Sequence, residues 1–149
     1  MKLDQDASGI FFAEVPADFL GGLSAGPSAK VVFLRRGRPH AHQVAWVERL
    51  LSGEIDDRQV VLAAAFMEWN RCAAERPALG LVALDVPAAV MGRLAITTIY
   101  VYRNLRETGM QYGLAGKWAA EPVHGFGVVV WGGTVKTLGR SGVAAGELG

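Results

Sequence analysis

The stretch DRQVVLAAAFMEWNRCAAE, from Asp57 to Glu75, decides our interpretation of the fold. Residues 60–67 are eight consecutive apolar residues, and most of the charge in the stretch lies toward its two ends. A helix that is apolar almost all round must be covered on most sides, by the rest of the chain or by a partner chain. We therefore place this helix at the centre of the fold, and we expect Leu62 and Phe66 to be nearly fully buried.

A second helix is predicted directly before the central one, over about 40–52. Val44, Val47 and Leu51 recur at the spacing of a single helix face. The connection between this helix and the one at 57–75, SGEID, is short. The two helices are therefore predicted to form an antiparallel hairpin.

The stretch 87–107 gives two conflicting signals. Its middle, ITTIYVY at 96–102, has high β propensity. Its ends are typical of a helix, with Pro87 at the start and Gly109 just after the end. No clean two-residue alternation is visible, so we interpret the stretch as a third helix.

The stretch FGVVVWGGTVKTL, at about 126–138, predicts a β-hairpin. The pair Gly132-Gly133 supplies the positive φ angles that a two-residue turn needs between β-branched runs. Val130 should then pair with Val135.

Together these elements predict one α+β domain spanning 1–149, with the helical hairpin at its centre. Short N-terminal strands are expected at 10–15 and 30–36. Residues 110–123 are expected to be irregular, and the glycine- and alanine-rich tail at 140–149 is expected to fray.

The composition favours a chain that buries apolar surface against partners. Half of the 149 residues are apolar and the mean hydropathy is +0.24, which is high for a small soluble monomer. The longest candidate membrane span, 77–102, contains Asp85 and Arg93, each of which costs about 2.5–3.5 kcal/mol near the centre of a bilayer, so we reject a transmembrane helix. The N-terminus has no signal peptide pattern and the chain has one cysteine, so the expected compartment is the cytoplasm.

A basic cluster lies where the second predicted strand meets the first helix, in the sequence RRGRPHAH at 35–42. Its core, Arg-Gly-Arg-Pro, resembles an AT-hook, a minor-groove DNA-binding element, over four residues. Such cations could hold phosphates beside the N-terminus of the next helix. We favour the alternative of a solvated surface turn, and the net charge of +1 argues against a generally basic coat protein. The candidate nucleic-acid-binding residues are Lys30, Arg35, Arg36 and Arg38.

No metal or cofactor site is predicted. His40 and His42 diverge at a helix start and His124 lies far along the chain, so their spacing is not that of a zinc site. Cys72 falls in the last turn of the central helix, whose negative end opposes thiolate formation, so we interpret it as a core residue. The glycine-rich stretches lack complete phosphate-loop and dinucleotide-binding patterns.

The favoured function is a non-enzymatic structural or interaction subunit of a larger cytosolic or phage-type assembly. The chain would form a homo-oligomer or join a protein complex. Charged residues are few in the last forty-two positions, which predicts an apolar C-terminal interface. The candidate interface residues are Trp118, Phe126, Val129 and Trp131.

Two alternatives stay open at this point. One is a nucleic-acid-binding subunit that uses the basic cluster. The other is a small enzyme whose site is assembled from residues scattered along the chain, such as Tyr100, Tyr102, Glu107 and His124.

Overall fold

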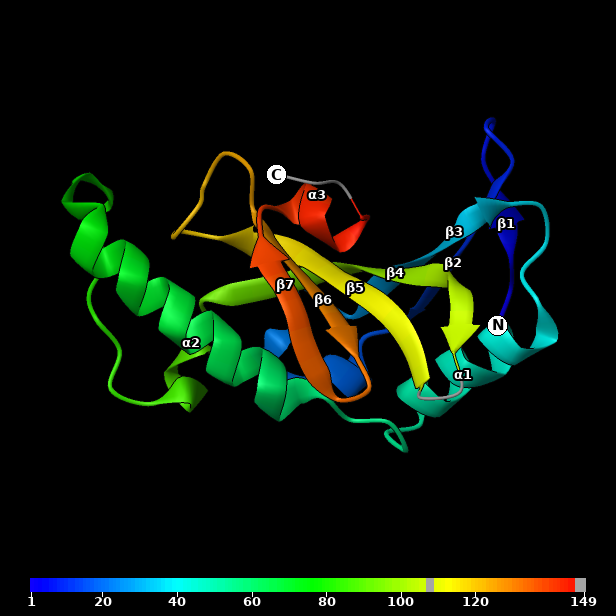
Figure 1. Ribbon diagram of the computed structural model, residues 1–149, viewed down its shortest axis with the longest axis horizontal. Helices are drawn as coiled ribbons and strands as arrows, with labels where there is room; N and C mark the ends of the chain where they lie inside the picture. Colours follow the sequence, from blue (N-terminus) through cyan, green and yellow to red (C-terminus); the bar gives the residue numbers. More distant parts are fainter. Residues whose placement is uncertain (107–108, 147–149) are drawn as a thin grey trace.

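The computed structural model describes residues 1–106 and 109–146. Its dominant element is a seven-stranded mixed sheet whose strands lie in the order in which they occur in the chain (Figure 1). The strands are β1 (Asp4–Gln5), β2 (Ile10–Pro16), β3 (Ser28–Arg36), β4 (Leu94–Arg106), β5 (Gly109–Trp118), β6 (Phe126–Trp131) and β7 (Thr134–Gly139). Neighbouring strands are antiparallel except β3 and β4, which are parallel.

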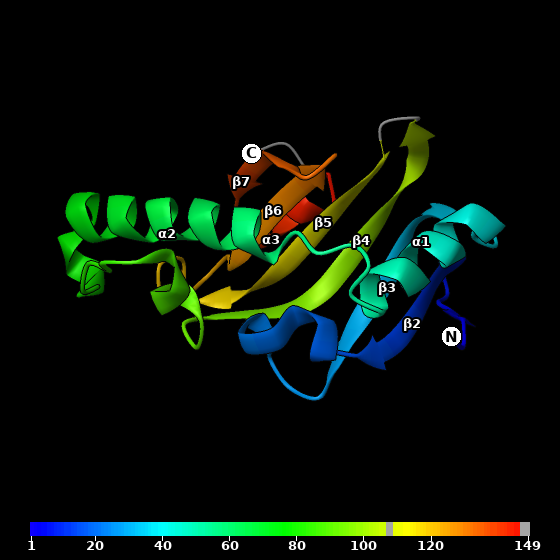
Figure 2. The same ribbon diagram turned by 90° about the horizontal axis from the view of Figure 1, so that it is seen from below.

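Two long helices form the crossover that the parallel pair requires. They are α1 (Ala41–Leu51) and α2 (Arg58–Glu75), and both lie on one face of the sheet, which we call the helix face (Figure 2). The short helix α3 (Ser141–Ala144) packs on the opposite face, against β5 and β6. The rest of that opposite face, over β2, β3 and β4, is called the open face. Three 3₁₀ segments complete the described elements, namely η1 (Asp18–Leu23), η2 (Pro77–Leu79) and η3 (Pro87–Val90).

The core lies between the sheet and the helices of the helix face. In β3, Ala29, Val31 and Phe33 are buried toward the helices, whereas Lys30 and Val32 lie on the open face. This two-residue alternation is the pattern of a sheet with one covered face. One cross-strand row of buried residues is formed by Phe33, Val101, Tyr112 and Val130.

The predicted central helical hairpin is wrong. Helices do occur close to 40–52 and 57–75, but Figure 2 shows α1 and α2 one after the other along the sheet, not folded back on each other. α2 packs instead against the segment that follows it, where the indole N–H of Trp69 donates to the carbonyl of Val82 (2.8 Å). The sheet, and not α2, is therefore the central element of this α+β fold.

α2 is also less covered than its apolar run predicts. Leu62 is buried, as expected, but Phe66 is only half-buried and Met67 is 72% exposed. One side of the helix contacts the sheet and the following segment, while the other side faces solvent with Ala63 and Met67. Several residues of the run are alanines, so Met67 is the one large apolar side chain of the run that the structure shows as exposed.

The third helix predicted over 87–107 is wrong as well. Within the described part of that stretch, only 87–90 are helical, and 94–106 form β4 in the middle of the sheet. The β-branched run gains strand partners on both sides, which outweighs the helix-like signals at its ends. A bulge between Ile96 and Thr98 shifts the alternation, and this shift hides the two-residue period in the sequence.

The C-terminal hairpin is confirmed. Gly132 and Gly133 have φ angles of 57° and 74°, and Val130 pairs with Val135. The two N-terminal strands are also observed, as β2 and β3.

Two stretches are more ordered than their glycine content suggests. Residues 110–118, which we expected to be irregular, form most of β5, and residues 141–144 of the expected frayed tail form α3, which packs on it. Gly113 permits this contact, because a Cβ there would lie 1.9 Å from the carbonyl oxygen of Ala144. The hydroxyl of Tyr102 donates to the same carbonyl (2.9 Å) and fixes α3 to the sheet.

Candidate functional site

A hollow of about 540 Å³ lies on the side of the sheet opposite the long helices. Thr98 and Tyr100 of β4 and Lys117 of β5 line it from the sheet, while His124 and Ser141 line it from the side. Figure 1 shows the connection between β5 and β6, which carries His124, rising beside α3. We call this site the open-face hollow.

The lining of the open-face hollow is rich in hydrogen-bond donors. Lys117 supplies a positive charge, and Tyr100, Ser141 and His124 supply O–H and N–H groups. None of the described residues that line it is an aspartate or a glutamate. Val123, which is 80% exposed, adds an apolar wall. Such a lining suits an anionic group attached to a less polar body.

Local contacts hold His124 beside α3. The backbone N–H of Ser141 donates to the carbonyl of His124 (2.9 Å), and the carboxylate of Glu121 accepts from the backbone N–H of His124 (3.4 Å). Glu121 also pairs with Arg76, the residue that follows α2 (3.3 Å). Burial alone would raise the pKa of Glu121, but these two hydrogen bonds outweigh it and lower the pKa, so the carboxylate stays charged at neutral pH. Its charge is balanced by that of Arg76.

The open face continues from the hollow across β3 and β2. Lys30 lies next to Thr98 in the parallel pair, Val32 lies next to Tyr100, and Phe12 lies next to Val32. The ammonium group of Lys30 is 4.5 Å from the centroid of the Phe12 ring, which is a cation–π contact. The face therefore presents aromatic rings and a cation beside the hollow, with the exposed Glu14 opposite Lys30 in the pairing of β2 with β3.

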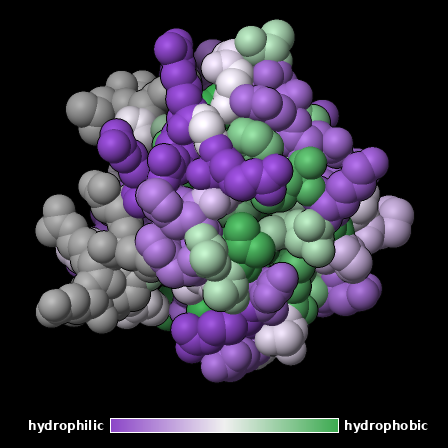
Figure 3. All heavy atoms as spheres, turned by 90° about the vertical axis from the view of Figure 1, so that its right-hand side faces the viewer, coloured by the Kyte–Doolittle hydropathy of each residue, from purple (hydrophilic) through white to green (hydrophobic). Residues whose placement is uncertain are grey.

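The structure separates the candidate nucleic-acid-binding residues into two places. Lys30 lies in the middle of the open face, whereas Arg35, Arg36 and Arg38 lie at the end of β3 and in the turn after it. Arg36 is six residues from Lys30, or about 20 Å along a strand. Figure 3 looks onto this end of the molecule, where the surface is mostly hydrophilic around a smaller apolar patch.

Two arginines of this turn contact neighbouring rings. Arg35 hydrogen-bonds to the His40 ring, and the guanidinium of Arg38 lies 5.6 Å from the centroid of the Phe11 ring. His40 stacks on His42, with 5.2 Å between ring centroids, and desolvation followed by the charge of Arg35 lowers the pKa of His40. Among the residues that the structure describes, no group of three or more His, Cys, Asp or Glu side chains could hold a metal ion.

The candidate interface residues lie mostly inside the core of the chain. Trp118, Phe126 and Val129 are buried, and the Trp118 ring packs edge-on against Phe126 with 4.9 Å between centroids. Trp131 is half-buried, with the ammonium group of Lys136 5.2 Å from its ring centroid. The low charge of the C-terminal third therefore accompanies burial under α2 and α3. An interface that uses Trp131 stays a prediction.

The residues named for an enzyme site are partly brought together. Tyr100 and His124 both line the open-face hollow. Tyr102 instead fixes α3, and Glu107 lies outside the described residues. Cys72 is buried, and burial raises the pKa of its thiol, so it is a neutral thiol at neutral pH.

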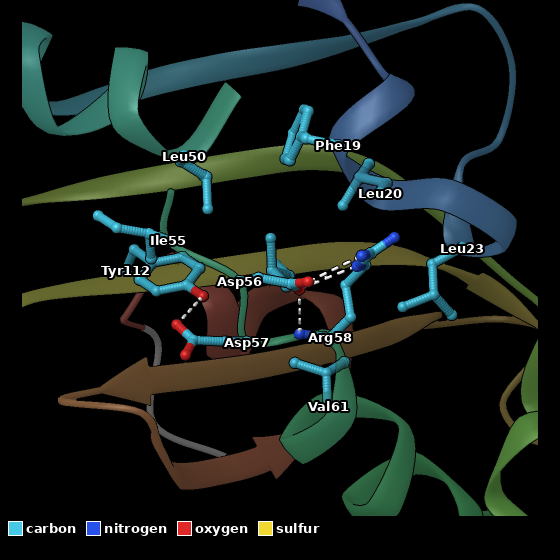
Figure 4. A pocket seen from close by; sticks show the side chains of 11 residues that line it. Phe19, Leu20, Leu23, Leu50, Ile55, Asp56, Asp57, Arg58, Val61 and Tyr112 are labelled. Carbon is cyan, nitrogen blue, oxygen red and sulfur yellow. Dashed lines mark hydrogen bonds and ion pairs between the residues drawn. The ribbon is translucent and has the colours of Figure 1, made fainter. Parts of the chain in front are cut away.

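A second polar cluster, which sequence reasoning missed, lies where η1, α1, α2 and β5 meet (Figure 4). The hydroxyl of Tyr112 donates to the carboxylate of Asp57 (2.6 Å), and Asp56 pairs with Arg58 (2.7 Å). The cavity beside them has a volume of about 20 Å³, which is room for a single water molecule and too small for a larger ligand. We therefore interpret the cluster as a structural contact that ties α2 to the sheet. Tyr112 and Asp57 are 55 positions apart, and Asp57 looks like a helix cap in the sequence, so no local signal reveals the pair.

We expect Tyr112→Phe to lower the free energy of unfolding by about 1–3 kcal/mol, because Asp57 loses a hydrogen-bond donor in a half-buried place. Urea denaturation would measure this change. In the Tyr112→Phe variant, the further substitution Asp57→Asn should lower the free energy of unfolding by less than it does in the wild-type chain. Equal costs in the two backgrounds would contradict an energetic link between the two side chains.

The same pair should make stability depend on alkaline pH. Burial, and then the hydrogen bond to Asp57, raises the pKa of Tyr112 above its ordinary value of 10.0. A raised pKa in the folded state means that this stabilisation is complete below pH 10 and is lost as the pH rises further. The wild-type chain should therefore lose more stability above pH 10 than the Tyr112→Phe variant. If the free energy of unfolding falls equally with pH above pH 10 in both chains, the expectation is contradicted.

Comparisons of the chain with protein-family models, with curated proteins and with solved structures find no match. In the described parts of the chain, no helix is both long enough and apolar enough to cross a membrane.

Proposed function

We propose that the protein is a non-enzymatic binding subunit whose recognition site is the open-face hollow, and that the group it recognises is an anion. The lining of the hollow carries this proposal. Lys117, His124 and several hydroxyl groups surround about 540 Å³, a volume within the usual range of small-ligand sites, and no carboxylate is found among the described lining residues. Phosphate and carboxylate oxygens accept strong hydrogen bonds from such donors.

The interaction role expected from the sequence then belongs to the open face and not to the C-terminal third of the chain. The apolar side chains of the C-terminal third pack within this chain. The open face instead leaves Phe12, Val32 and Tyr100 half-buried, with no described helix above them. A sheet face toward water is normally polar, so partly exposed rings and β-branched side chains next to a cationic hollow support a binding surface.

The first test compares two lysine substitutions with the same change in charge. Lys117→Glu places a negative charge in the hollow and should weaken phosphate binding by about tenfold or more. Lys136→Glu, on the exposed strand β7, is the matched control and should leave binding unchanged. Binding is measured from NMR chemical-shift changes during titration with phosphate, with chloride adjusted to keep the ionic strength constant.

The wild-type shifts should saturate and should concentrate on residues 97–100 and on His124. Shifts that do not saturate, or an equal loss of binding in both variants, would contradict an anion site in the hollow. Circular dichroism of both variants would establish that they keep the fold.

A second candidate function is binding of single-stranded nucleic acid across the open face. The specific observation is the row Phe12–Val32–Tyr100, in which two aromatic side chains flank a small apolar one, with Lys30 against Phe12. Bases stack on exposed aromatic rings of a sheet, and neighbouring cations bind the phosphates.

A charge-reversal pair distinguishes this surface from the basic turn. Lys30→Glu on the open face should weaken binding of a labelled oligothymidylate by about tenfold, while Arg38→Glu in the turn should have little effect. Fluorescence anisotropy at two salt concentrations measures both. The reverse order of effects would assign binding to the turn, and no binding by the wild-type chain would contradict this candidate.

A further inference from the structure

A separate cleft of about 390 Å³ lies between α2 and the end of β7. Three arginines line it: Arg71 lies in the C-terminal half of α2, Arg76 directly follows that helix, and Arg140 directly precedes α3. The carboxylates of Glu68 and Glu121 line it as well, each paired with one of the first two arginines. Trp118 of β5 forms another part of the wall. The cleft lies on the helix-face side of Trp118, so it is distinct from the open-face hollow.

The indole of Trp118 has an unmet hydrogen bond. Its side chain is only 6% exposed, and its N–H has no hydrogen-bond partner among the described residues. The neighbouring Trp69 shows the usual arrangement, because its indole N–H donates to the carbonyl of Val82. Buried donors without a partner are rare in folded proteins, so the unpaired indole N–H of Trp118, whose side chain lines the cleft, points to a missing acceptor.

The arginines of the cleft differ in their pairing. Arg71 binds Glu68 and Glu75 (2.5 and 2.6 Å), and Arg76 binds Glu121 (3.3 Å), so both guanidinium groups are held in place by acids. Arg140 has no acidic partner among the described residues. It therefore contributes a positive charge that no described carboxylate balances.

Cys72 adds no negative charge to the cleft. Burial, followed by the charge of Glu68, raises the pKa of its thiol, so the sulfur stays protonated at neutral pH. An incoming anion is thus not repelled by a thiolate beside Arg71.

We propose that this cleft is a second binding site, specific for a small oxyanion such as a phosphate or a carboxylate group. Arg140 would supply the charge, Arg76 a further guanidinium donor, and Trp118 an indole N–H to one anion oxygen. Planar guanidinium groups match the oxygens of both kinds of anion, and a fixed N–H donor adds direction to the contact.

The Trp118 indole N–H itself reports on the site. In an ¹H–¹⁵N NMR spectrum the indole signals of the tryptophans form a separate group, and Trp118→Phe assigns the relevant one. Titration with phosphate, and separately with acetate, at constant ionic strength should give a saturable downfield shift of the Trp118 signal. The Trp69 signal, with its donor already bonded to Val82, should stay in place. The anion that binds with the lower dissociation constant identifies the preferred oxyanion class.

Arginine substitutions then locate the charge that binds the anion. Arg140→Gln should raise the dissociation constant obtained from the Trp118 titration by about tenfold, and Arg76→Gln should also raise it. Arg49→Gln, at the end of α1, removes the same charge from an arginine that pairs with Glu54 and is the matched control. The absence of a saturable shift, or an equal loss in the control, would overturn the proposal. Because Lys117→Glu should leave the Trp118 titration unchanged, failure here is distinguishable from failure of the open-face hollow.

Discussion

Phe126→Ala is expected to lower the free energy of unfolding by about 3–5 kcal/mol, a large part of the total stability of a domain of this size. Phe126 is fully buried and lies opposite Gly116 in the pairing of β5 with β6. Its ring also packs edge-on against Trp118. Because Gly116 has no side chain to move into the vacated space, the substitution should leave a cavity between β6 and the helices.

Phe66→Ala is the control for this prediction. The sequence places Phe66 in the middle of the apolar run of α2, yet its side chain is only half-buried. The same loss of a phenyl ring should therefore cost clearly less there. Denaturant unfolding of both variants gives the comparison. A cost at Phe66 equal to or above that at Phe126 would show that α2, and not the sheet, carries the core.

Local signals in the sequence located several elements correctly but did not arrange them. The apolar periodicity around 41–51 and the apolar run at 60–67 come from neighbouring residues, and so does the turn chemistry of Gly132-Gly133. The relative placement of α1 and α2 depends instead on the parallel pairing of β3 with β4, which joins residues more than sixty positions apart, such as Val31 and Ile99. Nothing in the short connection between the helices encodes that pairing.

The strands that sequence reasoning missed have specific physical causes. In β4 the bulge after Ile96 shifts the side-chain alternation, so a central strand lacks its two-residue period. In β5 the glycines at 113 and 116 lower the strand propensity, yet each lies where another backbone approaches too closely for a side chain. Both features can be recognised only once the neighbouring strands are known.

The candidate sites depend on these same long-range pairings. Tyr100 and His124 were named from the sequence as scattered residues, and the strand order places both at the open-face hollow with Lys117 and Ser141. The basic cluster at 35–42, in contrast, is a contiguous run of sequence, but two of its arginines contact the His40 and Phe11 rings, and none of its arginines, all of which the structure describes, lines the hollow. A contiguous motif therefore predicted less about the site than residues that the sheet brings together.

Gly113→Ala is expected to cost about 3 kcal/mol, at the upper end of the usual cost of over-packing. A Cβ at this position would lie 1.9 Å from the carbonyl oxygen of Ala144 and 2.6 Å from its carbonyl carbon. Both atoms belong to backbone, so no side-chain rotation relieves the clash. α3 must then move off the sheet, which exposes Ala144 and breaks its hydrogen bond with the hydroxyl of Tyr102.

Gly26→Ala is the matched control, because an added Cβ at Gly26 would meet no atom within 4 Å. Its effect on the free energy of unfolding should stay within about 0.5 kcal/mol. Hydrogen exchange distinguishes local from global damage in Gly113→Ala: amides of 141–146 should exchange faster, while those of β3 and β4 stay protected. Unchanged exchange of 141–146 together with unchanged stability would show that α3 does not rest on β5. Since Ser141 lines the open-face hollow, displacement of α3 should also weaken phosphate binding there, which links the packing of this glycine to the proposed function.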